Sequence, residues 1–453
     1  MLARFFRLEE NGTTVGREMQ AGLTTFAAMA YILAVNPTIL AAAGMDRSAL
    51  VTITALSSAI ATVLMVFMTN YPLALAPGMG TNAMFAFYIC GALSVPWPDA
   101  LGMVAVNGCI FLLLSLTGVR ESIMRAIPYS LKMAITCGIG VFIAFIGLKN
   151  SGIIVSDPNT YVRAGDFAGG SVALCLSGLV VTAVLVARRV PGAIVLGMVI
   201  TAFIGLFVPA GGHGPDGHAI MVTRLPESII WLPASPAPHF LKLTFTFLRS
   251  WDAFARALPV ILALLMLDMF DNIGTLIGVT KRAGLLDKDG NLPRAGRALV
   301  ADSIAAVVSA FLGTSTVVSY IESASGVAAG GRTGLTGLTV AALMLLALFF
   351  SPLILSIPAA ATAPALIIVG VFMFQSVAEI RMDDFVTAAP AVLTIMTIPL
   401  TFSISDGIGI GVVSAALLGL CTGRARSMTL VGYVIAAIFF LRFFHLPPFH
   451  GAM

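Results

Sequence analysis

Charge is what this sequence has least of. Only 10% of its 453 residues are Asp, Glu, Lys or Arg, whereas a soluble domain carries roughly 25%. Hydrophobic residues make up 58% of the chain. This composition excludes a large soluble domain and predicts an all-α polytopic membrane protein, because each helical span needs about 20 apolar residues. The net charge of +4 is modest, and its basic residues lie in loops, so we expect no nucleic-acid partner.

Metal-ligand and nucleotide motifs are also lacking. The five cysteines are scattered through apolar runs, and the histidines fall outside those runs without ligand spacing. We therefore expect no metal site, and small buried side chains at the cysteines. No G-x-x-x-x-G-K-[ST] phosphate loop is present, which argues against a built-in ATPase. An ion gradient is the more economical energy source, with a proton as the coupling ion, sodium as the alternative, and no cofactor.

Long apolar runs fill the rest of the chain. We expect fourteen spans, at about 21–43, 50–69, 76–93, 101–119, 132–148, 171–187, 191–209, 257–279, 298–312, 316–330, 335–357, 359–379, 386–402 and 406–422. A further apolar run at about 427–444 could span the membrane or lie along its interface. The N-terminus has no signal-peptide cleavage pattern, so the first span should remain.

Basic residues orient the predicted spans. They precede the first span and gather between spans four and five, six and seven, and eight and nine. The positive-inside rule then places the N-terminus in the cytoplasm of a multi-pass protein of the plasma (inner) membrane, surrounded by lipid. We expect a cytoplasmic segment at 1–20, a first repeat at 21–209, an external loop at 210–256, a second repeat at 257–426, and a C-terminal apolar helix and tail at 427–453. Seven spans in each half make the repeats inverted.

Two spans are interrupted by small and polar residues. The third opens LALAPGMGTNAMFAFYI, and the tenth opens FLGTSTVVSYIES. Irregular backbone at membrane depth is tolerated only where it is buried in protein or lines a cavity. Transporters with inverted repeats place their binding site at such broken helices, near the midplane. The third segment of each half is therefore predicted to form the site.

Three carboxylates lie inside apolar stretches. They are Asp268 and Asp271 in ALLMLDMFDNIGTLIGV, and Glu322 in GTSTVVSYIESASG. A charge at the centre of a span costs about 2.5–3.5 kcal/mol even on the lenient insertion scale. Asp268 and Asp271 are three residues apart and share a helix face, which favours a proton held between like charges. Either aspartate alone could instead be a structural acceptor.

Other polar side chains accompany these acids. Thr314, Ser315 and Thr316 could hold a polar ligand through hydroxyls and free amides, or could serve helix packing. Asn82 carries a donor and an acceptor suited to the edge of a heterocycle. Phe85 could stack on a planar ligand, or simply pack. Asn36 could line the same cavity or bond carbonyls freed by Pro37.

Four motifs carry a family resemblance. They are FRLEENGTTVGREMQAGLTTFAAMAYILAVNPTILAAAGMD, LAPGMGTNAMFAF, DMFDNIGTLIGV and GTSTVVSYIESASGVAAGGRTGLT. In this order they resemble the azaguanine-type purine permeases of the nucleobase–cation symporter-2 (nucleobase–ascorbate transporter) superfamily, from residue 5 to about 426. The resemblance implies fourteen spans in a seven-plus-seven inverted repeat, with spans 1–4 and 8–11 as a core domain and spans 5–7 and 12–14 as a gate domain. It also implies proton-coupled uptake of adenine, guanine or hypoxanthine, and often a homodimer.

The resemblance also assigns residues. The family's third-span asparagine falls at Asn82, its eighth-span acids at Asp268 and Asp271, and its tenth-span glutamate at Glu322. The D-N-I-G sequence makes Asp271 the acid that pairs with the base. We expect a purine between Asn82, Asp271 and Glu322, with amides near Thr81 and Thr314–Thr316 completing the contacts. Asp268, Asp271 and Glu322 are the candidates for proton coupling, and Asp268 either takes part directly or orients Asp271.

Two other functions are weighed against a purine symporter. Related folds carry anions, but three acids and no intramembrane Arg or Lys around the site speak against an anion. An intramembrane enzyme using the two aspartates lacks a second catalytic motif. We therefore expect a transporter and not an enzyme, with the preferred purine left open.

Overall fold

The structure is a computed structural model. It describes residues 2–117, 128–213, 219–226, 228–283, 285 and 293–444. At a few positions within these ranges, Asp271 among them, only the backbone is described.

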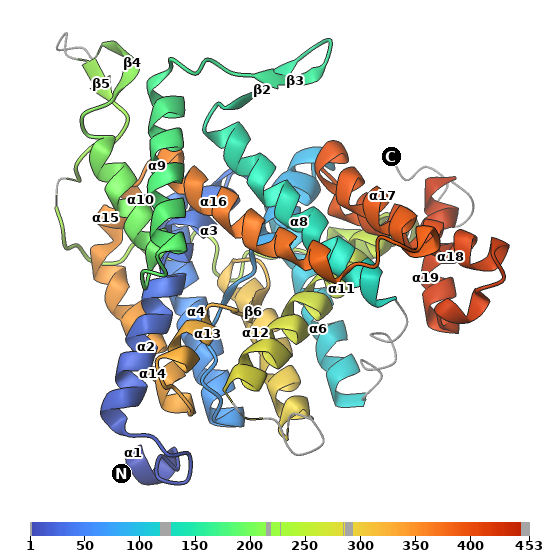
Figure 1. The fold of residues 1–453 in the computed structure, drawn as a ribbon, viewed down its shortest axis with the longest axis horizontal. Coiled ribbons are helices and arrows are strands. Elements are labelled where there is room, and N and C mark those ends of the chain that lie inside the picture. Colours follow the sequence, from blue (N-terminus) through green and yellow to red (C-terminus); the bar gives the residue numbers. More distant parts are fainter. Residues whose placement is uncertain are drawn as a thin grey trace.

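Apart from two hairpins in the first half, the helices and strands follow the same order in each half of the chain (Figure 1). After α1 (Leu2–Phe5), the first half contains α2 (Val15–Met29) with α3 (Ile32–Ala41), α4 (Arg47–Thr69), β1 (Leu75–Pro77) with α5 (Met79–Ala83) and the π-helix η1 (Met84–Ala92), α6 (Trp97–Thr117), α8 (Tyr129–Asn150), α9 (Gly170–Ala187) and α10 (Ala193–Ile204). The second half contains α11 (Trp251–Arg282), α12 (Ala295–Leu312), β6 (Val317–Ser319) with α13 (Ser323–Ala328), α14 (Gly334–Ala347) with α15 (Ser351–Ser356), α16 (Ala359–Phe374), α17 (Phe385–Thr401) and α18 (Ile404–Cys421). The helix α19 (Leu430–Phe443) comes last.

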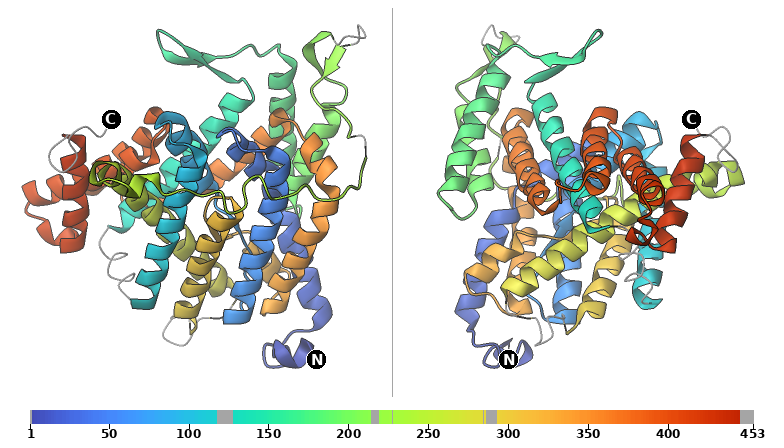
Figure 2. Two further views of the ribbon diagram at one scale, coloured as in Figure 1. Left: turned by 180° about the vertical axis from the view of Figure 1, so that it is seen from behind. Right: turned by 45° about the vertical axis from the view of Figure 1, so that its right-hand side comes forward.

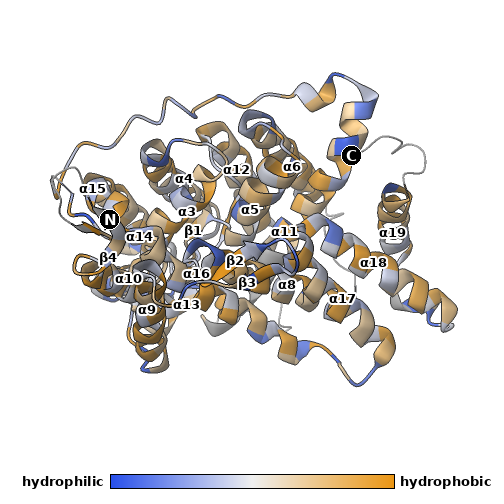
Figure 3. Cartoon of the chain, turned by 90° about the horizontal axis from the view of Figure 1, so that it is seen from above, coloured by the Kyte–Doolittle hydropathy of each residue, from blue (hydrophilic) through white to orange (hydrophobic). Residues whose placement is uncertain are grey.

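Helix length and composition agree with a membrane protein of this size. Within the described ranges, nine helices are long and apolar enough to cross a membrane, and three shorter apolar helices accompany them. Large apolar side chains such as Leu116, Phe203 and Leu400 are exposed, as expected where lipid replaces water. Seen from above, most helical ribbon is coloured between white and orange, the hydrophobic part of the scale, while blue is concentrated in connections and at helix ends (Figure 3).

The predicted breaks in the third and tenth spans are confirmed. Each of these segments begins as a short strand and continues as a helix. The two strands pair antiparallel, with Leu75 opposite Ser319 and Pro77 opposite Val317. Strands in equivalent places of two repeats run in opposite directions when the repeats are inverted, so the pairing fits the predicted seven-plus-seven architecture.

Figure 2 shows the same helices from two further sides. We call the elements of the predicted core spans, α2 to α6 with β1 and η1 and α11 to α15 with β6, the core group, and those of the predicted gate spans, α8 to α10 and α16 to α18, the gate group. In the core group α4 packs on α3, α12 and α14, and α6 packs on α11 and α12. In the gate group α8 packs on α16 and α17, α17 on α18, and α9 on α10 and α16. The strand pair β1–β6 lies within the core group, against α4, α11 and α12.

Some helix ends differ from the predicted ends. The helix α10 ends at Ile204, since the chain then enters the hairpin of β4 (Pro209–His213) and β5 (Ala219–Met221). This hairpin and that of β2 (Ile154–Asp157) and β3 (Tyr161–Ala164) project from the face opposite α1 (Figure 1). The helix α11 starts at Trp251, before the apolar run, because hydrogen-bonded turns continue through polar residues such as Asp252.

A segment without long helices, 228–249, connects the halves. Its backbone bonds to core elements, with Leu241 N–H donating to Phe311 O at 2.9 Å and Thr244 N–H to Pro98 O at 2.9 Å. The Thr244 hydroxyl also donates to Asp99 Oδ1 at 2.7 Å. We call residues 228–249 the strap. Part of the expected loop 210–256 is therefore bound to the core rather than free.

Candidate functional site

The two strands hold the ends of the broken segments together. Gly78 N–H donates to Thr316 O at 2.9 Å, and Tyr320 N–H donates to Ala74 O at 2.9 Å. A side chain at position 78 would bring a Cβ to 2.7 Å from Thr81 Oγ1 and 3.1 Å from a Val318 methyl, so glycine permits this close approach. Two segments that are more than 200 residues apart in sequence thus share one backbone network.

Asn82 lies on α5, just beyond this network. Its Oδ1 accepts a hydrogen bond from the Ser315 hydroxyl, which comes from the opposite segment. Its Nδ2 finds no acceptor among the described residues, although the side chain is fully buried. A buried donor without an acceptor costs about 1–3 kcal/mol. An unpaired buried amide of this kind is suited to a bound polar ligand.

The hydroxyls predicted around Asn82 are also buried. The Thr81 hydroxyl donates to Gly78 O at 2.9 Å. The Thr316 hydroxyl has no partner within the described part of the chain. Thr314 Oγ1 lies 3.4 Å from Asn36 Nδ2, which donates also to Thr54 Oγ1 at 2.7 Å. The Asn36 amide therefore links the first span to the Thr314 hydroxyl of the tenth, instead of bonding carbonyls freed by Pro37.

Glu322 lies between β6 and α13, where it is half-buried. Its Oε1 accepts a hydrogen bond from the Tyr31 hydroxyl at 2.7 Å. Tyr31 is buried at the break between α2 and α3 in the first span. A phenol that donates to a carboxylate orients it, because charge-assisted hydrogen bonds are short and strong.

Asp268 is held from another direction. It is fully buried on α11, and its Oδ2 accepts from Asn107 Nδ2 of α6 at 2.6 Å. The helix α11 packs against α5, β6 and α13, so Asp268 and the broken segments belong to one packed unit. Asp271 lies on α11 as well, but its side chain is outside the described residues, and its predicted role stays a prediction.

Asn272 and Phe85 complete the set. Asn272 Oδ1 accepts from Ser319 N–H at 2.9 Å, which fastens α11 to β6. Its Nδ2 has no acceptor among the residues described. Phe85 is fully buried in the main apolar cluster, and its stacking on a ligand stays a prediction.

Among the predicted residues, the structure shows Asn82 and Ser315 in direct contact. Glu322 and Asp268 are instead seen bonded to two residues that were not predicted, Tyr31 and Asn107. Sequence reasoning missed these last two residues. Each is a polar group inside an apolar run, the same signal that drew attention to the acids.

Comparison with known proteins places this chain among permeases. A family model described as "Permease family" matches residues 16–410. The guanine/hypoxanthine permease PbuG of Bacillus subtilis is 43% identical over 456 residues, covering 98% of this chain and 99% of the relative. The adenine permease AdeQ of Escherichia coli is 42% identical over 441 residues, covering 97% of this chain and 96% of the relative.

A solved structure shares the fold. The transmembrane domain of the cyanobacterial bicarbonate transporter BicA matches with a TM-score of 0.64, at 18% identity, over 87% of this chain and 97% of that chain. At this identity the likeness concerns the fold alone.

Proposed function

This chain belongs to the Xan_ur_permease family, in the purine branch of the nucleobase–ascorbate transporters, and we propose that it imports purine nucleobases by proton symport. Its relatives are permeases, so the chain is a transporter and not an enzyme. Relatives at 42% and 43% identity carry the names of adenine and guanine/hypoxanthine permeases, which supports adenine, guanine and hypoxanthine as substrates.

The observation that carries the proposal is the paired broken segments with Asn82 beside them. A purine has ring nitrogens that accept and N–H groups that donate. Asn82 Nδ2 and the Thr316 hydroxyl, for which the described residues offer no partner, supply donors. A carboxylate at Glu322 supplies an acceptor already oriented by Tyr31. A site that pairs every polar edge of its ligand discriminates strongly against compounds lacking those groups.

We propose that acids within the apolar segments carry the coupled proton. Asp268 is fully buried and accepts a hydrogen bond from the Asn107 amide, and loss of a proton there creates a charge at membrane depth. We propose that Asp268, with Asp271 and Glu322, takes up a proton before substrate release. Asn107 would keep the Asp268 carboxyl in place in both protonation states, since an amide can donate or accept.

Alternating access completes the proposal. The core group carries Asn82, Glu322 and Asp268, and the gate group packs against it. Movement of one group against the other would expose the site to either side in turn. The N-terminus would be cytoplasmic, in the inner membrane, and the protein a homodimer, which crosslinking in native membranes would test.

The test is uptake of radiolabelled hypoxanthine and adenine in a host that lacks purine transporters. The variant Glu322→Gln should lose uptake while reaching the membrane in normal amount. Its matched control is Glu379→Gln, because Glu379 also accepts from a tyrosine, Tyr129, but at an exposed position on the gate group. Undiminished uptake by Glu322→Gln would overturn the assignment.

Two additions to this assay test the coupling ion and the substrate class. A protonophore should abolish accumulation, whereas removal of sodium should leave it unchanged. Excess hypoxanthine should compete with labelled adenine, and excess sulfate should not. Competition by sulfate would favour an anion carrier.

A further inference from the structure

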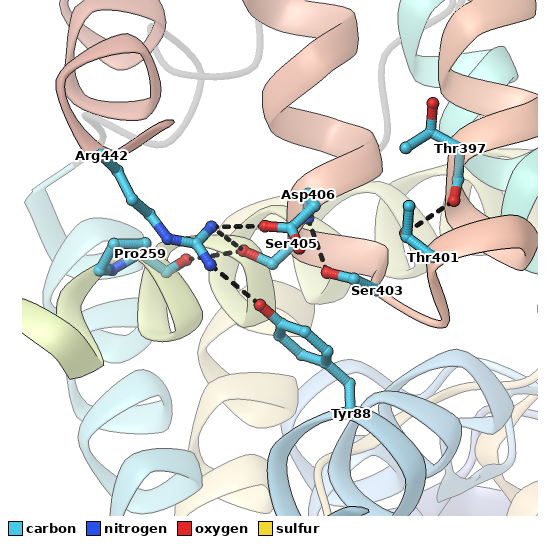
Figure 4. A network of polar contacts seen from close by, with 8 residues as sticks. All are labelled: Tyr88, Pro259, Thr397, Thr401, Ser403, Ser405, Asp406 and Arg442. Atoms are coloured by element: carbon cyan, nitrogen blue, oxygen red, sulfur yellow. Dashed lines mark hydrogen bonds and ion pairs between the residues drawn. The ribbon is translucent and has the colours of Figure 1, made fainter. Parts of the chain in front are cut away.

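One arginine near the end of the C-terminal helix contacts three residues from two other helical segments. Arg442 Nη1 lies 2.7 Å from Asp406 Oδ1, and its Nη2 donates to the Tyr88 hydroxyl at 3.0 Å (Figure 4). Nη1 also lies 3.4 Å from Ser405 Oγ. The Arg442 side chain is only 16% exposed. A guanidinium this far removed from solvent needs its partners, because an unpaired buried charge is costly.

The partners of Arg442 belong to different helix groups. Tyr88 is buried on η1 in the core group, six residues after Asn82 on the continuous helical stretch Met79–Ala92. Asp406 lies in the first turn of α18 in the gate group, where its N–H donates to Ser403 Oγ at 3.0 Å. Arg442 itself is on α19, which packs on α18. Its guanidinium therefore connects the helix that carries the substrate-site asparagine to the gate.

We propose that Arg442 is a positioning residue that latches the core to the gate in this conformation, so that the C-terminal helix sets how readily the transporter changes state. The proposal rests on the alternating-access function proposed above. The planar guanidinium can hold two partners at once. When the core moves, Asp406 and Arg442 can stay together, whereas the Tyr88 contact has to break.

The hydrogen bond between Arg442 and Tyr88 affects the transport cycle only if its free energy differs between the conformations of the transporter. A group that interacts in one state and not in another shifts their ratio by that difference in free energy. Tyr88→Phe removes only the hydroxyl that crosses between the groups and leaves the ion pair intact. Arg442→Gln removes the charge as well. Both variants should populate a second arrangement of core and gate.

The chain offers convenient sites for measuring this arrangement. Cys109 on α6 of the core and Cys421 on α18 of the gate are both exposed. Cys90, Cys137 and Cys175 are changed to alanine, so that spin labels attach only to Cys109 and Cys421. Pulsed electron paramagnetic resonance (double electron–electron resonance) then measures the distance between the core and gate labels. We expect one dominant distance without further change. In Tyr88→Phe and Arg442→Gln the ratio of a second distance to the first should rise by about tenfold, which corresponds to about 1.4 kcal/mol.

A matched control comes from a second ion pair at the same end of the chain. Arg424 Nη1 lies 2.8 Å from Asp384 Oδ2, but the Arg424 side chain is 56% exposed, and the pair joins the start of α17 to the chain just after α18, both at the gate end. Arg424→Gln should therefore leave the distance distribution unchanged. Thermal unfolding of each variant in detergent shows whether the protein remains folded.

The outcomes separate the latch from the proposed function. An unchanged distance distribution in Tyr88→Phe would overturn the proposal, whether or not Arg442→Gln is less stable. The contacts of α19 would then serve only to stabilise the fold. The distance measurement needs no substrate. A shifted distribution in a protein that transports no purine would therefore support the latch while the purine assignment fails.

Discussion

Two fully buried polar side chains of this molecule have opposite surroundings. The carboxylate of Glu18, at the start of the first span, accepts four hydrogen bonds: from the backbone N–H groups of Arg332, Thr333 and Thr336, and from the Thr336 hydroxyl. Asn82 accepts one, and its Nδ2 has no acceptor among the described residues.

This difference separates structure from function. Glu18 satisfies the free N–H groups at the start of α14 and thereby joins α2 to α14, as a carboxylate at a helix N-terminus does. At the broken helix, Asn82 Nδ2 has no acceptor among the described residues and so can donate to a ligand. Burial of a polar group by itself does not indicate a ligand site; an incomplete set of hydrogen bonds beside paired broken helices supports one.

The largest effect is expected at Glu18. Glu18→Ala leaves several buried N–H groups without an acceptor, and should lower the free energy of unfolding by roughly 3 kcal/mol or more. Thermal unfolding in detergent measures this loss, with Glu9→Ala, at an exposed position, as the control. An unaltered unfolding temperature would show that the Glu18 network is not structural.

Asn82 should behave in the opposite way. Asn82→Ala should weaken purine binding about tenfold, since a hydrogen bond to the ligand is worth up to about 1.5 kcal/mol and a loss of about 1.4 kcal/mol is a factor of ten, while the unfolding temperature changes little. Asn70 is the matched asparagine, because its Nδ2 donates to Phe6 O at 3.0 Å and its Oδ1 accepts from Gly334 N–H at 2.8 Å. Asn70→Ala should lose stability and keep its affinity once folded. If Asn82→Ala, like Asn70→Ala, lost stability but not purine affinity, Asn82 would be a structural residue and not a ligand-binding one.

A smaller effect is expected at Tyr31. Tyr31→Phe removes the hydroxyl that orients Glu322, and should reduce the apparent affinity for purine about fivefold, or about 1 kcal/mol. Concentration dependence of uptake measures it. Tyr129→Phe removes the equivalent hydroxyl from exposed Glu379 and should have no effect. Equal changes in the two variants would argue against a special role for Tyr31.

The smallest effect concerns pH and the strap. His239 Nε2 accepts from Asp46 N–H at 3.0 Å, and its ring packs edge-on to Trp97. Burial lowers the pKa of His239 from its ordinary value of 6.5, although the Asp46 carboxylate opposes this. The unfolded chain therefore binds the proton more readily, and stability should fall as the pH drops below about 6.5.

Amide hydrogen exchange across residues 228–249 at about pH 7.5 and about pH 5 tests this prediction. After each rate is corrected for the pH dependence of intrinsic amide exchange, the protection of these amides should be lower at the lower pH, and His239→Gln, which keeps an acceptor but does not titrate, should reduce the difference. The same pH difference in both proteins would exclude His239 as its cause.

The broken segments could be predicted because their signal is local. Pro77, Gly78 and the hydroxyls after Gly313 are unsuited to a lipid-facing helix, and the strand pair is found where those residues lie. The equal number of spans on each side of the strap likewise follows from apolar runs, since a membrane imposes its thickness on each span.

The contacts that orient the acids could not be predicted. Tyr31 and Glu322 are 291 residues apart, and Asn107 and Asp268 are 161 apart. A single sequence marks such residues as polar intrusions but does not say which intrusion meets which. The same holds for Glu18 and Arg442, whose partners are fixed by helix packing rather than by neighbouring sequence.

Equilibrium binding of radiolabelled hypoxanthine and adenine to the purified protein tests the central claim most directly. The unmodified protein should bind at least one of them, in competition with unlabelled purine and not with sulfate, and Asn82→Ala and Glu322→Gln should each bind at least about tenfold more weakly while remaining folded. Full affinity in both variants would contradict a purine site at the paired broken segments.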